Sequence, residues 1–580
     1  MRQARILQNV VGGSYESDDR KAGYSVSQNL YAEEVEKAGN GFYFTTSLRS
    51  VPGERKVLEN FVVSDRYKQG CRGMFTASDG SVFAAFGDGI YRTRKNAITG
   101  RYDFEIISSY DVPSIGQVRF CETGGINSHV CWIDGSENIR AYPLSPEKAT
   151  SAGFSLPLSF HTPLRQYRTA DEVVNDINEH IRPSQICSLN GSLIINDPES
   201  DTWYYTDAYI LGGTKYTREI YDLDEGGNVR YKPGSRYEVL TREVRLTDFD
   251  PSSNTSYIWL DRYSKPNFVT AEYSADKVTG MKVAGDFLYV FGTNSIQVYS
   301  QRTSTDAQGF TSMVFSSSGQ NIREIGCGII DSIQSVGNVI VFWGENGGGQ
   351  RGVYSISGAS VTRLSTNAME RSMDGKNLEG IRSLTYSENG HSFYCLKVPA
   401  LARTFCYDFK TDQWHDRTTM DSRSNDGCWW AEYSAYSGGD ILIAGSSEQC
   451  IAKLDKDKFD DYKGDPIVKR RITPAIINDH SPFMVNDVEL VWNTGTTRDV
   501  TNENGAMDPV VMLEVSDDGG NIFSEEMWAY GGCAGSYSER TIWYGVGAMG
   551  TEIVFRFTIT DRVPVVVTGA KIGFTVLNGV

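Results

Sequence analysis

Several features that define common protein classes are missing from this sequence of 580 residues. No apolar run approaches the roughly 18 residues that a membrane-spanning helix needs. The first residues, Met1 to Leu7, are followed by polar residues and glycines, so no secretory signal forms there. We therefore expect a soluble protein that is made in a cytoplasm and does not insert into a membrane.

Clustered metal ligands and paired cysteines are also missing. The ten cysteines include no C-x-x-C pair, and the six histidines are scattered along the chain. Several cysteines lie in strand-like apolar runs, such as Cys131 before Trp132, which is typical of buried reduced thiols. We expect no metal site and no cofactor.

Positive charge is in deficit. The chain has 56 Lys and Arg against 73 Asp and Glu, which gives a net charge of −17. A nucleic-acid clamp needs a basic face to neutralise phosphates, so this balance disfavours one. It does not exclude a surface past which nucleic acid slides without sticking.

Sequence motifs typical of catalytic sites are missing as well. There is no G-x-S-x-G nucleophile motif, and the G-x-G-x-x-G match at residues 347–352 is followed by a strand-like run, where a dinucleotide site needs a helix. His129, His391 and His415 follow no nucleophile pattern and are interpreted as polar residues at strand edges or in loops. We predict no catalytic residues and no enzyme activity.

Glycine and aromatic residues, by contrast, are plentiful and form a repeated hairpin. In the example centred on residues 285–300, two apolar and aromatic runs flank the turn Gly292-Thr293-Asn294-Ser295, whose glycine and asparagine tolerate the positive φ of a tight reversal. Similar hairpins start at Val82, Val130, Leu193, Leu288, Ile340 (turn Gly344 to Gly349), Phe393 and Leu442.

Four of the six intervals between these starts are close to the ~40–50 residues of one propeller blade. The sequence therefore predicts an all-β fold with a β-propeller-like body of six to seven blades over residues 61–460. Residues 1–60, with a short strand at Asn29-Leu30-Tyr31, are expected to form an N-terminal extended arm.

Two longer intervals contain inserted segments. Residues 164–183 predict a helix, because Thr169 and Glu172 form a capping box ahead of an apolar face and Pro183 ends it. Residues 209–265 are charged and rich in tyrosine, and predict a small inserted β subdomain. This subdomain is either an accessory binding surface or a solvated decoration without a partner.

The pattern changes after Asp455, where the polar stretch Lys456 to Arg471 is interpreted as a boundary, and residues 466–580 predict a C-terminal β-sandwich. Alternation in 553–559 places Ile553, Phe555, Phe557 and Ile559 on one face and Arg556 on the other. Within this domain the stretch Ser516 to Phe523 fits S-x-D-x-G-x-x-[aromatic], and so resembles the Asp-box hairpin of sialidases. Its members Ser516, Asp518, Gly520 and Phe523 are expected to brace the hairpin, with the carboxylate accepting turn amides.

The order of segments resembles the packaged-DNA stabilisation proteins, or tail hub (nozzle) proteins, of short-tailed bacteriophages, a family of podovirus tail accessory factors. The resemblance runs across most of the chain and is carried by these stretches: Asn29-Leu30-Tyr31, Val51-Pro52-Gly53, 291–296, Gly326-Cys327-Gly328, 339–344 with Val353-Tyr354, 364–370, 406–409 with Gln413-Trp414, and 516–520.

This resemblance implies a structural virion protein of the tail, without catalytic residues. The family's members assemble as a homo-oligomer, expected to be a hexameric ring, below the portal and its adaptor (the head-to-tail connector). The ring would extend the channel for transiently passing double-stranded DNA, retain the packaged genome together with a plug or needle protein, and dock tail fibres or spikes. The inserts at 164–183 and 209–265 depart from shorter family members.

Two other functions remain open at the level of sequence. A propeller of the sialidase type would bind or hydrolyse glycans, but it would need Asp-boxes repeated in its blades, and here the motif occurs once, in the terminal sandwich. A generic scaffold propeller that binds a host protein is the third class. The oligomeric state of the purified protein, alone and with tail neighbours, separates these functions.

Overall fold

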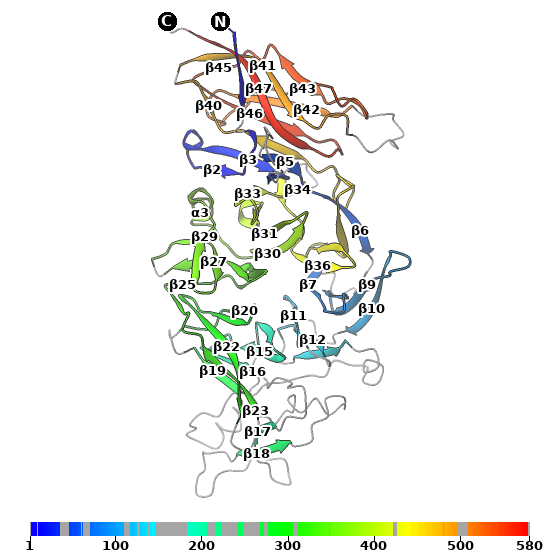
Figure 1. Ribbon diagram of the computed structural model, residues 1–580, viewed down its shortest axis with the longest axis vertical. Coiled ribbons are helices and arrows are strands. Elements are labelled where there is room, and N and C mark those ends of the chain that lie inside the picture. Colours follow the sequence, from blue (N-terminus) through cyan, green and yellow to red (C-terminus); the bar gives the residue numbers. More distant parts are fainter. Residues whose placement is uncertain are drawn as a thin grey trace, which may run out of the picture.

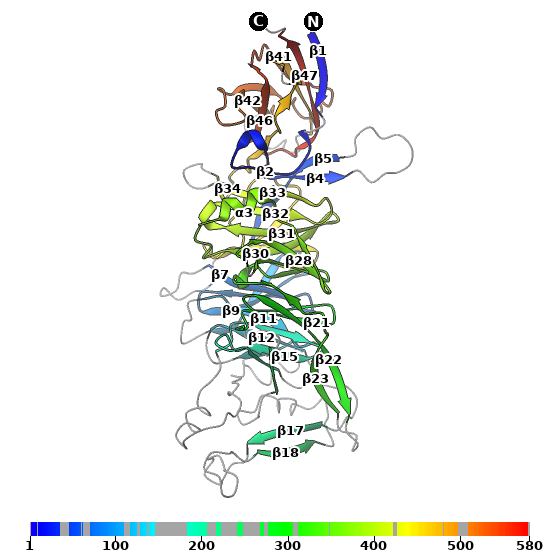
Figure 2. The ribbon, with the colours of Figure 1, turned by 90° about the vertical axis from the view of Figure 1, so that its left-hand side faces the viewer.

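The computed structural model is an elongated all-β molecule (Figure 1). A ring of β-sheets occupies its middle and is seen face-on in Figure 1 and edge-on in Figure 2. A second β module carries both chain ends. The structure describes residues 2–7, 10–34, 46–59, 61, 70–109, 116–124, 128–135, 139–144, 182–205, 216–221, 241–246, 267–271, 276–305, 311–346, 348–420, 426–479, 481–496 and 508–577.

Seven antiparallel sheets form the blades of a propeller. The first four are β7 (Cys71–Thr76), β8 (Val82–Phe86), β9 (Gly89–Lys95) and β10 (Tyr102–Ser109) in blade 1; β11 (Arg119–Glu122), β12 (His129–Ile133) and β13 (Arg140–Pro143) in blade 2; β14 (Ile186–Leu189), β15 (Ser192–Asn196), β16 (Thr202–Tyr205) and β19 (Asn267–Thr270) in blade 3; and β20 (Gly280–Ala284), β21 (Phe287–Phe291), β22 (Ser295–Thr305), β23 (Thr311–Ser317) and β24 (Ile322–Arg323) in blade 4.

The remaining three blades complete the ring. They are β25 (Ile325–Gly326), β26 (Gln334–Val336), β27 (Val339–Asn346), β28 (Arg351–Ser357) and β29 (Ser360–Arg363) in blade 5; β30 (Arg382–Glu388), β31 (His391–Val398), β32 (Arg403–Asp408) and β33 (Gln413–Asp416) in blade 6; and β36 (Tyr433–Ser437), β37 (Asp440–Ala444), β38 (Cys450–Asp455) and β6 (Gly53–Glu59) in blade 7.

The ring closes on itself. The strands β7, β11, β14, β20, β26, β30 and β36 contact one another in this order, and β36 returns to contact β7. The outer strand of blade 7 is β6, which comes from the N-terminal part of the chain and pairs with β38. Closure therefore joins residues that are about four hundred positions apart in the sequence, so the ring is complete only when the two ends of the propeller segment meet.

Apolar strands hold the blades together. Val82–Phe86, His129–Ile133 and Ser192–Asn196 are buried at every position, because blades pack on both faces of these strands. Each pair of successive blades shares its own hydrophobic cluster, for example Val341 and Trp343 of blade 5 with Tyr394 and Leu396 of blade 6. The interior is thus divided into blade-to-blade layers around the ring.

The predicted propeller is confirmed, including its six to seven blades. The seven hairpin starts fall in β8, β12, β15, β21, β27, β31 and β37, which are seven corresponding strands of the blades. One boundary differs: the turn expected from Gly344 is shorter, because β27 continues to Asn346 and Glu345 still pairs with Arg351.

The C-terminal β-sandwich is also confirmed. One sheet contains β1 (Arg2–Leu7), β4 (Leu30–Glu34), β5 (Thr46–Ser50), β41 (Phe483–Trp492), β44 (Thr541–Tyr544), β45 (Met549–Gly550) and β47 (Val566–Val576); the other contains β2 (Tyr15–Glu16), β3 (Tyr24–Gln28), β39 (Lys469–Ile472), β40 (Ile476–Ile477), β42 (Val510–Ser516), β43 (Met527–Tyr530) and β46 (Glu552–Ile559). Ile553, Phe555, Phe557 and Ile559 enter the core between the sheets, as the alternation predicted.

The described parts of residues 1–60, which the sequence assigned to an extended arm, contribute strands to both modules. Strands β1, β4 and β5 belong to the sandwich, and β6 belongs to blade 7. The helix predicted for 164–183 lies outside the described residues except for its last two positions. Within 209–265 the structure describes only the antiparallel pair β17 (Tyr216–Tyr221) and β18 (Thr241–Leu246).

Few other elements occur in the described parts of the chain. They are the helix α3 (Asn367–Met373), the 3-10 turns η2 (Arg20–Ala22), η4 (Ile330–Ser332) and η5 (Pro399–Leu401), and the strand pair β34 (Thr418–Met420) with β35 (Asp426–Cys428). No helix in these parts is long and apolar enough to cross a membrane.

Candidate functional site

The junction of propeller and sandwich is built on a strand that both modules share. On one edge β3 pairs in parallel with β33 of blade 6, through Gln28 and Asp416. On the other edge it pairs antiparallel with β39 of the sandwich, where Val26 lies opposite Ile472. One sheet of eleven strands therefore runs from blade 6 into the sandwich.

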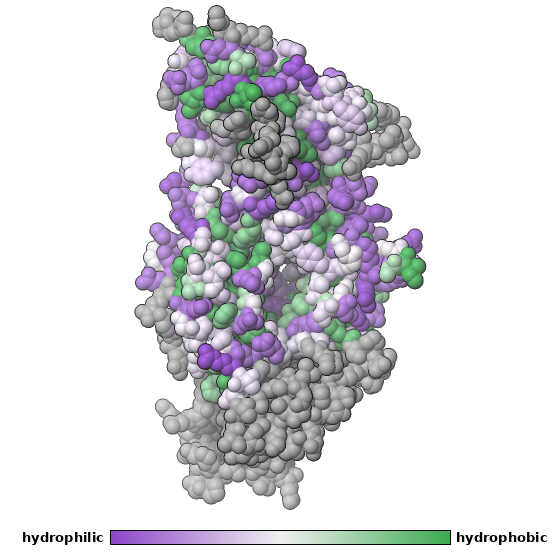
Figure 3. Space-filling view, in the orientation of Figure 1, coloured by the Kyte–Doolittle hydropathy of each residue, from purple (hydrophilic) through white to green (hydrophobic). Residues whose placement is uncertain are grey.

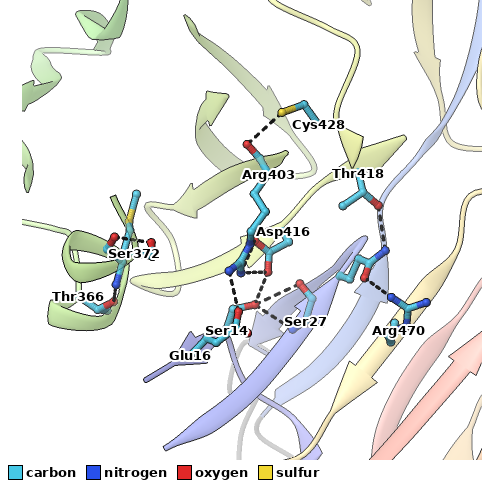
Figure 4. A network of polar contacts seen from close by, with 12 residues as sticks. Ser14, Glu16, Ser27, Thr366, Ser372, Arg403, Asp416, Thr418, Cys428 and Arg470 are labelled. Carbon is cyan, nitrogen blue, oxygen red and sulfur yellow. Dashed lines mark hydrogen bonds and ion pairs between the residues drawn. The ribbon is translucent and has the colours of Figure 1, made fainter. Parts of the chain in front are cut away.

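A network of polar contacts fixes this shared strand (Figure 4). Arg403 Nη1 donates to Glu16 Oε2 at 2.7 Å, and its Nη2 donates to Asp416 Oδ1 at 2.9 Å. Ser14 Oγ donates to the other oxygen of Asp416 at 3.0 Å and accepts from the amide of Ser27 at 2.9 Å. Residues of the N-terminal segment thus bind both blade 6 and one another.

The charges in this network stabilise each other. Burial acts to lower the pKa of Arg403, but the carboxylates of Asp416 and Glu16 outweigh it and raise that pKa above its ordinary value. Charge-assisted hydrogen bonds of this kind are about twice as strong as neutral ones. The arrangement is structural, because its donors and acceptors hold the N-terminal segment against blade 6.

Asn29 adds a bend next to the shared strand. It has a φ of 53° and lies in the left-handed region, which asparagine tolerates better than most residues. Its amide donates to Asp416 O at 2.7 Å, and its side-chain Nδ2 donates to Val468 O at 2.8 Å. The Asn29-Leu30-Tyr31 stretch singled out in the sequence is therefore the point where the chain turns from β3 into β4, between the two modules.

A buried carboxylate anchors the closing strand of the propeller. Glu54, in β6, accepts hydrogen bonds from Trp429 Nε1 at 2.7 Å and Trp430 Nε1 at 2.6 Å. The amide of Tyr462 also donates to it, at 3.2 Å. Burial raises the pKa of Glu54, while Arg417 and the two indoles oppose that rise. Nothing in the local sequence around Glu54 signals this role, since its partners lie far along the chain.

The Asp-box residues lie at the end of β42, on the face that meets the N-terminal segment. Ser516 Oγ donates to Asp518 Oδ1 at 2.6 Å, and the amides of Asn521 and Ile522 donate to the same oxygen. The hydrogen bond from Ser516, together with these amides, lowers the pKa of Asp518. Phe523 packs against a small cluster that includes Tyr24.

Gly520 shows why this hairpin needs a glycine. Its φ is 94°, and a Cβ at this position would lie 2.5 Å from the ring of Tyr24. Arg20 also donates a hydrogen bond to the carbonyl of Gly520. The Asp-box and the N-terminal segment are therefore packed together, and the box's polar groups are engaged in the turn.

The three histidines in the described parts of the chain, His129, His391 and His415, lie in the interior of blades. His391 Nδ1 is 2.7 Å from Asp408 Oδ2, with both side chains at most 1% exposed. His415 is likewise buried in β33, and His129 begins β12. His129 and His391 begin their strands, as the strand-edge interpretation expected, and His415 lies within β33. All three are buried, because blades cover both faces of the strands that carry them.

A cleft of about 580 Å³ opens between the two modules. Its wall includes Tyr31, Pro52, Glu388, Lys456, Phe459 and Pro564. Burial raises the pKa of Glu388, and Arg417 opposes that rise. Among the described residues no group of three or more His, Cys, Asp or Glu side chains is arranged to hold a metal ion.

Comparison with known proteins identifies both modules. The family described as bacteriophage P22 Gp10, beta-propeller, matches residues 258–459, and the one described as bacteriophage P22 Gp10, beta-sandwich, matches residues 469–575. Together the two matches span more than half of the chain. No curated protein matches.

Solved structures that resemble the chain do so weakly. The designed protein Ika8 has 11% identity and a TM-score of 0.30, over 69% of this chain and 99% of its own. The extracellular domain of a proposed one-component system from B. thetaiotaomicron has 10% identity and a TM-score of 0.32, over 81% of this chain and 47% of its own. A proposed 6-phosphogluconolactonase from Bacteroides uniformis has 11% identity and a TM-score of 0.32, over 67% of this chain and 95% of its own.

Proposed function

The chain belongs to the bacteriophage P22 Gp10 family of DNA-stabilisation tail proteins, and from that premise we propose that it is the tail hub of a short-tailed phage. In this function it forms a ring below the portal and adaptor and extends the channel for DNA. It also retains the packaged genome with a plug or needle protein. The chain acts by assembly and position, without catalysis.

The observation that carries the proposal is the shared sheet between propeller and sandwich. Domains joined by a linker and a small interface usually move relative to each other. Here backbone pairing continues from β33 through β3 to β39, so relative motion would break main-chain hydrogen bonds. A rigid two-module subunit is what a ring that holds pressurised DNA requires.

The acidic balance of the chain supports the channel role. A net charge of −17 favours a surface that repels phosphates, so that a duplex passes without being retained by contacts along the wall. In the proposed ring, carboxylates face the lumen. Neutralising lumen carboxylates is expected to slow ejection of the genome, and unchanged ejection kinetics would count against this part of the proposal.

The partners follow from the same function. We expect a hexamer, an adaptor at one end, and fibres or spikes docked on the side, with the insert 209–265 as the docking element. Deleting 209–265 should leave the ring assembled and remove the fibres. A particle that keeps all its fibres after this deletion would show that the insert is a solvated decoration.

The oligomeric mass of the purified protein distinguishes the proposed tail-hub function from the glycan-binding and scaffold alternatives. Native mass spectrometry would be recorded for the chain alone and for the chain mixed with a portal–adaptor complex. The proposal predicts a closed ring on the complex, with several copies per adaptor ring. A chain that stays monomeric, does not bind the portal–adaptor complex, and binds or cleaves bacterial glycans would favour the sialidase-like alternative.

A further inference from the structure

Two cysteines of blade 6 lie face to face on neighbouring strands. Cys395 in β31 and Cys406 in β32 are directly opposite each other in the antiparallel register. Their sulfur atoms are 2.8 Å apart, and the two residues are 1% and 0% exposed. Both belong to the hydrophobic cluster that joins blade 6 to blade 7. The fold therefore holds two thiols in contact in its interior.

This placement fits the geometry of a disulfide bond. Opposite residues of an antiparallel pair have Cα atoms about 4.5–5.5 Å apart, and disulfides join Cα atoms that are about 4.4–6.8 Å apart. A disulfide has its sulfurs about 2.05 Å apart, so each sulfur would move by less than about 0.5 Å from its present position. The strand pairing can stay as it is when the bond forms.

An imidazole completes the row of side chains. His415 of β33 lies directly opposite Cys406, on the side away from Cys395. It is 3% exposed, and its Nε2 has no hydrogen-bond partner within the part of the chain that the structure describes. Burial and the neighbouring Cys395 thiol raise the pKa of Cys406, and His415 opposes that rise. The imidazole is thus placed to take the proton of Cys406 and leave the nucleophilic thiolate.

A small uncharged molecule is the kind of oxidant that fits this site. Figure 3 shows a hollow in the middle of the ring. The innermost strand of blade 6 is β30, whose Leu384 lies opposite Cys395, so one strand separates the thiols from this hollow. A charged or bulky disulfide reagent would have to enter the packed cluster around the thiols. Hydrogen peroxide is uncharged and close to water in size.

We propose that Cys395 and Cys406 are a redox-sensitive dithiol, which hydrogen peroxide converts into a disulfide. The Cys406 thiolate attacks one oxygen of the peroxide and the O–O bond breaks. This leaves a sulfenic acid on Cys406 and a hydroxide, which takes the proton held by His415 and leaves as water. The Cys395 sulfur then attacks the Cys406 sulfur, the S–O bond breaks, and the hydroxyl leaves with the Cys395 proton as a second water. The two thiols lose two electrons and two protons, and one peroxide becomes two waters.

The disulfide would tie the two middle strands of blade 6 together. Strand β32 pairs with β33, which carries the junction to β3 and the sandwich. The bond would therefore stabilise the blade on which the two modules meet. A cytoplasm keeps thiols reduced, and disulfides persist outside cells. Only the timing rests on the proposed tail function: we expect the dithiol in newly made protein and the disulfide in released particles.

Peptide mapping of the purified full chain tests the proposal. Trypsin cleaves after lysine and arginine, so the two cysteines lie in separate peptides, 383–397 and 404–410, unless a disulfide joins them. The folded protein is treated with hydrogen peroxide, alkylated under denaturing conditions and digested without reductant. We expect 383–397 linked to 404–410 as the main disulfide product. The thermal midpoint of the oxidised protein should rise by about 2–5 °C.

Matched variants separate this pair from the other buried thiols. Cys395→Ala should leave 404–410 unlinked and abolish the rise in the thermal midpoint. Cys450→Ala is the control, because Cys450 belongs to the same cluster but lies opposite Glu59, and it should be oxidised like the wild type. His415→Gln should slow formation of the linked peptide severalfold, since Cys406 loses its neighbouring base. An unchanged rate in this variant would remove His415 from the step.

Two outcomes would overturn the proposal. One is that both cysteines are recovered as free thiols after a peroxide treatment that oxidises the exposed Met549. The other is a map in which Cys406 joins a different cysteine or stops as a sulfinic acid. Mapping of the wild-type chain decides the proposal even if a variant fails to fold. The readout needs neither ring assembly nor DNA retention, so failure of the dithiol and failure of the tail-hub function can be told apart.

Discussion

Glu54 Oε1 lies 4.0 Å from Arg417 Nη2, and both side chains are 2% exposed. The first residue belongs to the N-terminal strand that closes blade 7, and the second directly follows blade 6. Arg417 also lies over the ring of Trp429, with its Cζ 3.8 Å from the centroid, and donates to Tyr386 Oη at 2.8 Å. A buried ion pair thus adds to the β6–β38 backbone pairing where distant parts of the chain close the ring.

Removing one partner of this pair should destabilise the protein strongly. Arg417→Met leaves Glu54 as a buried charge without its cation, and such losses cost about 3–5 kcal/mol. Urea unfolding, followed by tryptophan fluorescence, measures the change. The double variant Arg417→Met/Glu54→Gln should lose less than the sum of the single variants. Strict additivity would show that the pair does not act as a unit.

A matched control separates this effect from the loss of any surface arginine. Arg351 pairs with Glu345 at 3.0 Å, with both side chains 43% exposed. Exposed pairs contribute about 0–1 kcal/mol, so Arg351→Met should change the unfolding midpoint little. If Arg351→Met lowered the free energy of unfolding as much as Arg417→Met does, burial of the Arg417–Glu54 pair would not explain the effect.

The junction between the modules should loosen when Arg403 is replaced. Arg403→Ala removes the hydrogen bonds to Glu16 and Asp416, which are worth about 1.5–3 kcal/mol each for charged groups but less here because Arg403 is partly exposed. Hydrogen exchange in β3 should become faster, while exchange in blades 1 to 4 stays as it was. Arg363→Ala, which removes a pair with Glu370, is the control. Unchanged exchange in β3 would contradict the role of this network.

Lys469 should make stability depend on pH. Burial lowers its pKa to about 7 in the folded state, against about 10.4 in an unfolded chain. Between these values the unfolded state binds more protons, so Lys469 raises the free energy of unfolding with pH, by up to about 1.4 kcal/mol per unit. Below pH 7 both states are protonated and the contribution is constant at its least favourable value.

The measurement compares wild type with Lys469→Met in urea at pH 7.0 and 8.5. The wild type should gain stability relative to the variant over this interval. The comparison must be relative, because burial raises the pKa of thiols such as Cys131 to about 12, and ionisation of unfolded thiols above about pH 8.5 acts in the opposite direction. Lys571→Met, at an exposed site, should follow the wild type. Parallel profiles for wild type and Lys469→Met would show that Lys469 stays charged.

The Asp-box should act locally. Asp518→Ala removes the acceptor for the amides of Asn521 and Ile522 and for Ser516 Oγ, so exchange should accelerate in 516–524. The propeller should be unaffected, since the box contacts the sandwich and the N-terminal segment. Asp517→Ala, at the neighbouring position, serves as control. Equal acceleration in both variants would mean that the box carboxylate is not the brace.

Much of the propeller follows from local sequence. Most blades have a largely buried strand that ends in a turn with glycine, aspartate or serine, so starts such as Val82 and Leu288 can be recognised from the local sequence alone. Blade 6 is an exception, because β31 is followed by Pro399–Leu401. The strands of the sandwich can also be predicted from the local sequence, since Phe555 and Phe557 alternate with Arg556.

What could not be predicted depends on contacts between distant residues. Gly53–Glu59 has an unremarkable strand sequence, and only its pairing with β38 makes it the closing strand of the ring. Strand β3 is similar: nothing in residues 24–28 shows that its two edges meet blade 6 and the sandwich. The Arg119–Asp331 contact joins residues 212 positions apart. Such partners follow from topology and closure of the ring, which a single sequence does not encode locally.

The most direct test of the hub function is the DNA content of particles made without this chain. Capsids would be filled in a host that lacks the gene, treated with nuclease, and compared with the same particles after addition of the purified protein. The account predicts that DNA is lost or nuclease-sensitive without the chain and becomes protected once it is added, while the Arg417→Met variant protects less. DNA that is fully protected without the chain would contradict it.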